Sequence, residues 1–436
     1  MTLVGAQALA ETITVDDDGD ADFSSIQDAI EYASDGDTIQ VFTGTYTGTG
    51  PSVIDTLGKA ITINGANGLV VVDGEGARRV VQCVNGEDSS TVLRALVLRG
   101  GAAERGGGLY ARASSPKVIA CTFQGNTATS SGGAIYSTEG SPFVTTSVFT
   151  ANFAEAAGGA IHCHNAQLEV LFSDFDNNSA GQSWGGGGGA IKADGDSTLF
   201  VRGSLFTWNR GLDLEGWGGA IYSTADLTVI EESRFENNSA RWGGAILAMK
   251  SPGDSGPDPS LFVDDCAFQN NSADERYGGA IYCARLETTD IRGCDFDSNI
   301  AEMQGGGLYA GFNSSASVTV SDCTFTANEA REQWEESAGG GIYASGTVYL
   351  TESDFCGNVP DQIEGQWIDG QGNEIQRQCS DQCLSDFNGD GVVDGEELTY
   401  LLGTWGTDDP VADVNDDGII DGADLNVILG GWGACP

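Results

Sequence analysis

The sequence is dominated by a repeat that joins a Gly-Gly-Ala/Gly-Ile/Leu string to a following Phe-x-x-Asn string. The stretch "RFENNSARWGGAI" (234–246) shows both parts. Successive Gly-Gly strings begin between 25 residues apart (Gly218 to Gly243) and 35 residues apart (Gly243 to Gly278). The nine strings begin at Gly106, Gly132, Gly158, Gly188, Gly218, Gly243, Gly278, Gly305 and Gly339. A repeat of this length predicts one supersecondary unit stacked on itself, with loops of variable length.

The pattern inside each copy predicts strands. Runs such as "LFVDDCAF" and "SVTVSDCTF" are β-prone, are bounded by Gly and Asn, and lack a helical stripe. A unit of about thirty residues with short strands predicts one turn of a parallel β-helix, whose coils pair about 4.8 Å apart. We expect Phe and Ile to stack inside. We expect Asn at one corner, because it tolerates left-handed angles and can bond the same Asn one coil away, and Gly-Gly at another.

On these motifs the chain resembles the secreted right-handed parallel β-helix proteins of the pectin-lyase-like superfamily. The GGAI and FxxN repeats resemble the polymorphic outer membrane protein type from about Gly106 to Asn358. The preceding "ITVDDDGDADFSSIQDAIEYASDGDTIQVFTGTY" resembles the opening of pectin-lyase-like β-helices, which implies an N-terminal helical cap with Ser24 or Ser25 as its N-cap. Such a cap is expected because a terminal coil would otherwise leave unpaired edge groups.

Composition narrows the partners and the compartment. The chain has 436 residues, 64 acidic and 19 basic side chains, and a net charge of −45 at pH 7. Nucleic acid and anionic membranes are therefore poor partners, and no apolar run reaches the length of a membrane span. "MTLVGAQALA" ends in a small-x-small pattern, so we expect residues 1–10 to be the remnant of a signal peptide cleaved after Ala10. The prediction is a secreted, extracellular or cell-surface bacterial protein.

The eleven cysteines fit an oxidising compartment. Three of them stand two residues before the repeat's Phe, which predicts an inward position in three consecutive coils: Cys266, Cys294 and Cys323. They either pair between coils or fill the core as small hydrophobic side chains. The pairs Cys356/Cys379 and Cys383/Cys435 flank later segments and are favoured as disulfides.

Two acidic loops near the C-terminus have the ligand pattern of EF-hand calcium sites. "DFNGDGVVDGEE" and "DVNDDGIIDGAD" each place five oxygen-bearing side chains and one carbonyl at loop positions 1, 3, 5, 7, 9 and 12, and each leads into an apolar helical stretch. The predicted ligands of two calcium ions are Asp386, Asn388, Asp390, Val392, Asp394 and Glu397, and Asp413, Asn415, Asp417, Ile419, Asp421 and Asp424.

The tandem of loops resembles a dockerin, which implies a small α-helical, EF-hand-like domain and a cohesin-like protein partner. In that family, specificity lies at loop positions 10 and 11, which here are Gly395/Glu396 and Gly422/Ala423. These pairs differ from the Ser/Thr pair of the cellulosomal kind. The expected organisation is a β-helix over 11–365, a closing segment over 366–382 and the dockerin-like domain over 383–436, in an otherwise all-β protein.

The sequence leaves catalysis open. The Asn-Thr-Asp, Gly-His-Gly and Arg-Ile-Lys strings of polygalacturonases are absent, as are the Gln-Asp-Thr and Asp-Phe-Ile-Phe-Gly strings of pectin esterases. One cluster is a catalytic candidate, because the first and third residues after the inward Ile should face solvent. Six of the nine first positions are Tyr, but two adjacent coils carry His162 with His164 and Lys192 with Asp194. This patch is an acid/base site, a ligand or metal contact, or solvated surface variation.

A second row lies just before the Gly-Gly strings and consists of Trp184, Trp217, Trp242 and Tyr277. Flat aromatic faces in line suit sugar rings, and the alternative is that these rings are buried over a corner glycine. The hypothesis is an exported, calcium-binding β-helix protein that acts as a cell-surface or extracellular binding or adhesion protein for polysaccharide. The alternative is a polysaccharide lyase or glycoside hydrolase of the same superfamily, tethered by a dockerin.

Overall fold

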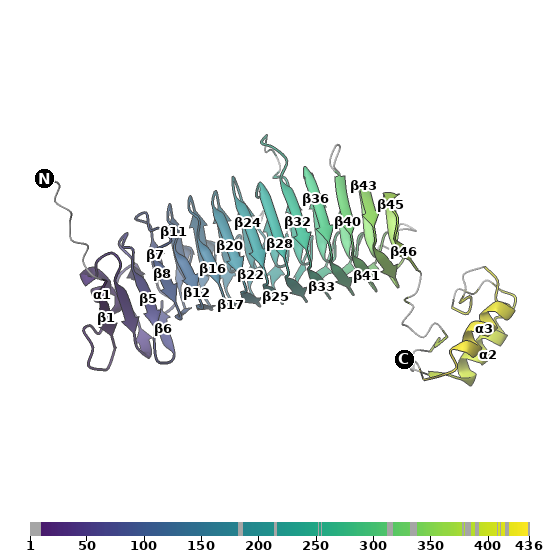
Figure 1. Ribbon diagram of the computed structural model, residues 1–436, viewed down its shortest axis with the longest axis horizontal. Helices are drawn as coiled ribbons and strands as arrows, with labels where there is room; N and C mark the ends of the chain where they lie inside the picture. Colours follow the sequence, from purple (N-terminus) through teal and green to yellow (C-terminus); the bar gives the residue numbers. More distant parts are fainter. Residues whose placement is uncertain are drawn as a thin grey trace.

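The chain forms a solenoid of stacked coils followed by a small helical unit (Figure 1). The computed structural model describes residues 10–434 apart from 182–185, 213–215, 252, 254, 312–316, 332–337, 377–378, 380–384, 389–391, 408, 410 and 415–417. One coil consists of β19 (Ile161–His164), β20 (Gln167–Leu171), β21 (Asp174–Asp176) and β22 (Ser179–Ala180). The next coil repeats it as β23 (Ile191–Asp194), β24 (Thr198–Arg202), β25 (Leu205–Thr207) and β26 (Arg210–Gly211). Every strand of the first coil pairs in parallel with its counterpart in the second.

The coils build three long parallel sheets. Among the described residues, the first two strands of each coil belong to a 24-stranded sheet A, the third to a 13-stranded sheet B and the fourth to a 9-stranded sheet C. The predicted all-β parallel β-solenoid is therefore confirmed. Consecutive coils stay in register although their loops differ in length, so a residue type that recurs at one position forms a straight row along the axis.

The repeat's Phe side chains form the centre of the core. All nine are buried, and neighbouring rings stack with centroids between 4.4 and 5.0 Å apart from Phe123 to Phe355. The Ile or Leu of each Gly-Gly string is also fully buried, as Ile161 and Ile191 illustrate. These inward positions were predicted correctly from the alternation of apolar and polar residues.

The Asn of each Phe-x-x-Asn forms a buried ladder, as expected. Asn238 Nδ2 donates to Asn271 Oδ1 at 3.0 Å, and Asn209 Nδ2 donates to Asn238 Oδ1 at 3.0 Å. The expectation that this Asn adopts left-handed angles is wrong. The residue before it does so instead: Asn237 has φ +55° and Ala327 has φ +53°. The ladder Asn is placed by its hydrogen bonds, while its neighbour takes the backbone strain.

The two positions of each Gly-Gly string require glycine for different reasons. Gly218 has φ +62°, which favours glycine. A Cβ on Gly219 would lie 2.0 Å from the carbonyl oxygen of Gly244 in the next coil, so that position admits no side chain. The predicted glycine corner is therefore confirmed, with close coil approach as a second cause.

The inward cysteines are free thiols in the structure. Cys266, Cys294 and Cys323 are buried and unpaired, so they fill the core rather than join coils. Ser occupies the same position in other coils, for example Ser233, whose backbone N–H points to Cys266 Sγ at 3.5 Å. Cys356 forms the favoured disulfide with Cys379. The other favoured pair, Cys383 and Cys435, lies outside the described residues.

One short helix lies beside the first strands of the solenoid, and paired strands lie at its other end. Helix α1 (Ile26–Tyr32), N-capped by Ser25, lies against β1 (Thr12–Val15), β2 (Thr38–Val41) and β4 (Ser52–Asp55). Its role as a cap stays a prediction. At the other end, β45 (Ile363–Asp369) pairs with β43 (Ile342–Thr351), and β46 (Glu374–Ile375) pairs with β44 (Asp354–Cys356). Paired strands thus continue into the segment expected to close the solenoid.

The C-terminal unit contains α2 (Gly395–Gly403), α3 (Gly422–Gly430) and an antiparallel pair of short strands, β47 (Val392–Val393) and β48 (Gly433–Ala434). Its small core is formed by Val393, Leu401, Ala412, Ile420 and Ile428. Within the described part of the chain, no helix has the length and apolar character needed to cross a membrane.

Candidate functional site

The structure brings the four residues of the predicted acid/base patch together. Strands β19 and β23 pair so that His162 lies opposite Lys192 and His164 lies opposite Asp194. Because alternate residues of a strand point to the same side, all four side chains lie on the outer face of sheet A. Asp194 is at the centre: its Oδ1 lies 3.2 Å from His162 Nε2 and 2.7 Å from His164 Nδ1, and its Oδ2 lies 3.9 Å from Lys192 Nζ.

The expectation that this outer row faces solvent is wrong. His162 is 8% exposed and Lys192 is 5% exposed. Neighbouring aromatic rings cover them: Tyr136 lies edge-on to His162 with centroids 5.2 Å apart, and Lys192 Nζ lies 2.9 Å from the centre of the Tyr222 ring. In this patch only the side chain of His164 is exposed, at 43%. A substrate can therefore reach His164 but hardly His162 or Lys192.

Burial and mutual contacts shift the ionisation of the patch. Burial lowers the pKa of Lys192 to about 7, against the opposing charge of Asp194. Burial also lowers the pKa of His162, so its imidazole favours the neutral form. The pKa of Asp194 lies well below its usual range: burial alone would raise it, but the hydrogen bonds to His162 and His164 and the nearby Lys192 outweigh burial. The patch is thus a carboxylate surrounded by imidazole and amine groups.

The predicted aromatic row packs on the outer face of sheet A and is not an exposed platform. Trp217 lies T-shaped on Tyr222 and Trp242 lies T-shaped on Tyr282, at 5.1 and 5.3 Å between centroids. Trp242 also meets Tyr277 edge-on at 5.1 Å, so these rings do not form one flat platform. Trp217, Trp242 and Tyr282 pack with Tyr222, Leu247 and Met249 in a satellite apolar cluster, which explains why this part of the outer row is buried. Trp184, the fourth member of the predicted row, lies outside the described residues.

A different aromatic row, which the sequence reasoning missed, lies on the second strand of each coil in sheet A. The strands are β16 (Phe143–Thr145), β20, β24, β28 (Leu227–Glu231), β32 (Ser260–Asp264) and β36 (Thr288–Arg292). Their register aligns six residues whose side chains alternate with buried ones: Phe143, Glu169, Phe200, Val229, Phe262 and Asp290. Phenylalanine thus recurs on every second coil. The three Phe side chains are half-buried and Glu169 is exposed.

Shallow depressions lie along this row, which we call the Phe row. One of about 390 Å³ is lined by Phe143, Glu169 and Phe200 among others, and another of about 210 Å³ is lined by Val229, Phe262 and Asp290 among others. The patch around Asp194 lies on the same two coils as Glu169 and Phe200, at the ends of the preceding strands. The Phe row and the exposed His164 therefore share one side of the solenoid.

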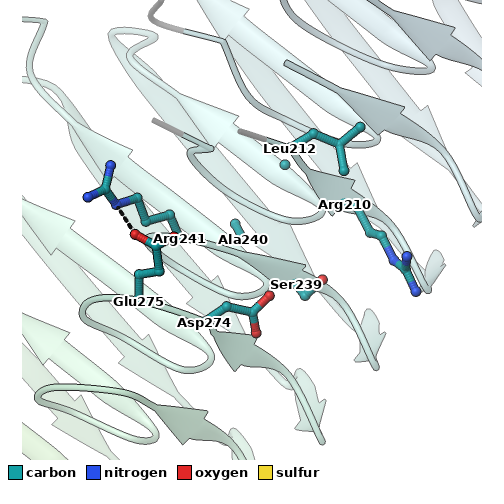
Figure 2. Close-up of a pocket in the computed structure, with 8 residues that line it drawn as sticks. Arg210, Leu212, Ser239, Ala240, Arg241, Asp274 and Glu275 are labelled. Atoms are coloured by element: carbon teal, nitrogen blue, oxygen red, sulfur yellow. Dashed lines mark ion pairs between the residues drawn. The ribbon is translucent and has the colours of Figure 1, made fainter. Parts of the chain in front are cut away.

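A larger depression, about 600 Å³, lies over sheet C and is polar (Figure 2). It is lined by Arg210, Ser239, Arg241, Asp274 and Glu275 among others. Arg241 Nε and Glu275 Oε2 form an ion pair at 2.9 Å, drawn as the dashed line in Figure 2. The arginine of this pair is thus neutralised by its neighbour, and the depression presents no aromatic ring.

The structure places nine of the twelve predicted calcium ligands, while Asp390, Asn415 and Asp417 lie outside the described residues. Asp394 and Asp421 are the N-caps of α2 and α3, and each forms a capping box with the last ligand of its loop, Glu397 or Asp424. Both of these last ligands are buried, at 1% and 0% exposure. Among the residues that the structure describes, Glu397 Oε1 has no hydrogen-bond partner, which is costly for a buried carboxylate oxygen. The remaining described ligands are Asp386, Asn388, Val392, Asp413 and Ile419.

Comparison with known proteins identifies the solenoid. Residues 105–296 and 183–376 match the model of the right-handed β-helix region, which together covers more than half of the chain. The chain is a right-handed β-helix protein. This family assignment confirms the predicted handedness of the coil and says nothing about its ligand.

Two known proteins are similar to parts of this β-helix protein. A metabotropic glutamate receptor-like protein R of Dictyostelium discoideum is 29% identical over 198 residues, which are 45% of this chain and 11% of that protein. A mannuronic acid-specific polysaccharide family 6 lyase from human gut microbiota superimposes with a TM-score of 0.43 at 13% identity, over 82% of this chain and 83% of the lyase. The chain spans about a tenth of the length of the curated relative that it matches.

Proposed function

We propose that this protein is exported, binds an extended, uncharged polysaccharide along the Phe row of its β-helix, and is attached to a cohesin-like partner by a calcium-loaded C-terminal domain. The observation that carries the proposal is the recurrence of Phe143, Phe200 and Phe262 on every second coil of one straight row. Val229 lies between the second and third of these rings and makes that part of the row apolar.

The spacing of the rings suits a regular glycan. Two coils advance the row by about 9.6 Å, because each strand spacing is about 4.8 Å. A chain of β-1,4-linked pyranoses advances by about one strand spacing per sugar and turns each sugar over, so every second sugar presents the same ring face. Phe143 and Phe200 can then stack on equivalent faces, which buries apolar area on both partners. Glu169, exposed between them, is an acceptor for sugar hydroxyl groups.

The charge of the protein limits the glycan. A net charge of −45 repels polyanions such as uronic acid polymers, and the Phe row itself contributes Glu169 and Asp290. An uncharged glycan avoids this repulsion, as does an anionic one bridged by calcium. We therefore expect neutral β-1,4-linked polymers as ligands in the absence of added divalent ions.

The C-terminal domain fits calcium. Glu397 Oε1, which is buried and has no hydrogen-bond partner within the described part of the chain, lies at the loop position where calcium loops use a bidentate glutamate, so a bound cation would satisfy it. The ligands would be the twelve residues named above, six for each ion. Bound calcium would supply the positive charge that holds each acidic loop closed against the helix that follows it. The disulfide between Cys356 and Cys379 supports export to an oxidising compartment.

One observation favours a second function, cleavage of the same polysaccharide by a lyase or hydrolase reaction. Asp194 Oδ1 lies 2.7 Å from His164 Nδ1, which fixes the imidazole and leaves Nε2 on the exposed side as a potential general base. His162 and Lys192 are too well covered to contact a substrate. Binding without turnover is therefore favoured, and the two functions differ in which residues matter.

The test is affinity electrophoresis of the full chain in gels that contain soluble neutral β-1,4-glucan, β-1,4-mannan or β-1,4-xylan, with polygalacturonate as the charged comparison. Phe200→Ala and Phe262→Ala should each weaken retention about 5- to 30-fold in Kd, since each lost ring removes about 1 to 2 kcal/mol of stacking and apolar burial. Phe172→Ala is the matched control, because Phe172 is 56% exposed and stands outside the row.

The proposed binding surface would be refuted if Phe200→Ala and Phe262→Ala both retained a neutral glycan as strongly as wild type does. Release of reducing or unsaturated ends by the wild-type chain, abolished in His164→Ala, would establish the enzyme in its place. Retention lost in Phe200→Ala and kept in His164→Ala, without product release, is the result that the binding function predicts.

A further inference from the structure

The patch around Asp194 has the composition of a transition-metal site, which is independent of the polysaccharide function. The chain has only two histidines among 436 residues, and both are directed to the same carboxylate. One ligand atom from each of His162, His164 and Asp194 lies within 4.8 Å of the other two. We infer that these three side chains bind one zinc ion on the outer face of sheet A.

The donor set favours zinc over calcium. Two imidazole nitrogens and one carboxylate oxygen match the three protein ligands of open zinc sites, in which water occupies the fourth position. Calcium and magnesium prefer oxygen ligands alone. Asp194 is half-buried and the side chain of His164 is 43% exposed, so the fourth position has access to solvent. His162 closes the inner side of the site.

The geometry requires only a small adjustment. Around a tetrahedral zinc ion with ligand bonds of about 2.1 Å, ligand atoms lie about 3.4 Å apart. Asp194 Oδ1 is 3.2 Å from His162 Nε2 and 2.7 Å from His164 Nδ1, so the atoms already converge and have to spread slightly. The two histidines are on one strand and the aspartate is opposite on the next, in a paired and continuous sheet. Such a scaffold holds the three ligands with little loss of conformational freedom on binding.

The proton balance identifies the stronger ligands. An imidazole nitrogen that donates its N–H to Asp194 has to give up that proton when it binds zinc, and the ring then carries its proton on the other nitrogen. The other nitrogen of His164, Nε2, lies 3.2 Å from Asn165 Nδ2 on the exposed side, where water can accept a proton. The other nitrogen of His162, Nδ1, is buried and has no hydrogen-bond partner among the residues that the structure describes. We therefore assign His164 and Asp194 as the main ligands and His162 as the weaker third one.

Lys192 does not occupy the site. Its ammonium nitrogen lies over the Tyr222 ring, 2.9 Å from the ring centre, and 3.9 Å from the Asp194 oxygen that faces away from the imidazoles. The lysine is therefore near Oδ2 of Asp194, while Oδ1 contacts the two histidines. Tyr136, edge-on to His162, excludes water from the inner side.

The experiment uses the full chain, stripped with chelator and dialysed into saturating calcium, so that the acidic C-terminal loops are filled before zinc is added. Zinc is titrated by calorimetry, and cobalt is added separately because tetrahedral cobalt gives visible absorption bands that report nitrogen and oxygen ligands. The wild-type chain should bind one zinc ion that His164→Ala and Asp194→Asn lose. Affinity should fall by more than about 100-fold, the upper end of what removal of an outer-shell partner costs.

Asp196→Asn is the matched control, because it removes the same charge from an exposed neighbour outside the patch and should leave zinc binding unchanged. His164→Ala decides the question if Asp194→Asn fails to fold, since its side chain is half exposed. Equal zinc binding by wild type and His164→Ala, or zinc binding by wild type without the cobalt bands, would overturn the inference. Because no glycan is present, the result is separate from that of the polysaccharide test.

Discussion

Replacing Asn238 by Ala tests whether the asparagine ladder stabilises the solenoid through its side-chain hydrogen bonds. Asn238 is fully buried. Its Nδ2 donates to Phe206 O at 2.9 Å and to Asn271 Oδ1 at 3.0 Å. Its Oδ1 accepts from the backbone N–H and from Nδ2 of Asn209, both at 3.0 Å. The substitution therefore removes four hydrogen bonds between three consecutive coils.

The expected cost follows from the donors left behind. Two buried N–H groups of Asn209 lose an acceptor, and each such loss costs about 1 to 3 kcal/mol. We expect Asn238→Ala to lower the free energy of unfolding by about 2 to 6 kcal/mol. Asn237 is the matched control: it precedes Asn238, has φ +55°, and Ala327 has the same backbone conformation in another coil. Asn237→Ala should cost no more than about 1 kcal/mol, because both residues carry a Cβ and Ala lacks only the local side-chain hydrogen bonding that lets Asn tolerate left-handed angles.

The assay is urea unfolding in calcium, followed by tryptophan fluorescence, with hydrogen exchange to locate the effect. In Asn238→Ala, the amides of the coils that contain Asn209 and Asn271 should exchange faster than those of distant coils. A stability within about 1 kcal/mol of wild type, or an equal loss in Asn237→Ala, would refute a ladder that acts through its side chains.

Three further outcomes follow from the structure. Glu397→Gln should weaken calcium binding in calorimetry while Glu396→Gln, one residue away, should not, because only Glu397 is the buried last ligand of its loop. Glu87→Gln should lower stability by about 2 to 4 kcal/mol, since the buried carboxylate accepts from Thr56, Ser114 and two backbone N–H groups. Burial would raise the pKa of Glu87, but these hydrogen bonds hold the pKa below its ordinary value of 4.5. The contribution of Glu87 to stability is therefore present above pH 4.5 and is lost as the pH falls through the lowered pKa. The melting temperature of Glu87→Gln should accordingly change less with acid than that of wild type. Trp242→Ala should lower the melting temperature and leave glycan retention unchanged, because the ring covers Tyr282.

The core of this protein was predictable because it repeats. Phe and Ile recur at fixed distances from Gly-Gly and Asn, and in a solenoid each recurrence lands on the same inner position. The acidic C-terminal loops could be singled out for a different reason, since the ligand spacing that predicts calcium binding is contained in twelve consecutive residues; calcium binding itself stays a prediction. Where adjacent residues share a type, the sequence could not divide their roles: Asn237 and Asn238 are both asparagine, yet one carries the left-handed angle and the other the hydrogen bonds.

Burial of the outer row was not predictable from strand alternation. Alternation correctly separates Ile221 from Tyr222 as inner and outer residues, but it does not show what lies over the outer face. Trp217, which covers Tyr222, stands directly before the same Gly-Gly string and pairs in register with Trp242, and alternation within one strand does not show which neighbouring side chain covers its outer face. The same covering leaves His162 and Lys192 nearly inaccessible, which is why the structure favours a held metal ion or a single exposed base over a four-residue catalytic patch.

The Phe row was hidden by the unequal lengths of the coils. Phe143, Glu169, Phe200, Val229 and Phe262 follow one another after 26, 31, 29 and 33 residues, so no fixed period in the sequence connects them. The extra loop residues lie outside the sheet and do not shift the strand pairing. The strand register therefore aligns the three rings at intervals of two coils. The regularity that a repeating polymer would recognise is therefore a property of the folded backbone. Lengthening a loop between β24 and β28 should leave glycan binding intact, whereas moving a ring by one strand position should abolish it, because the side chain would then point into the core.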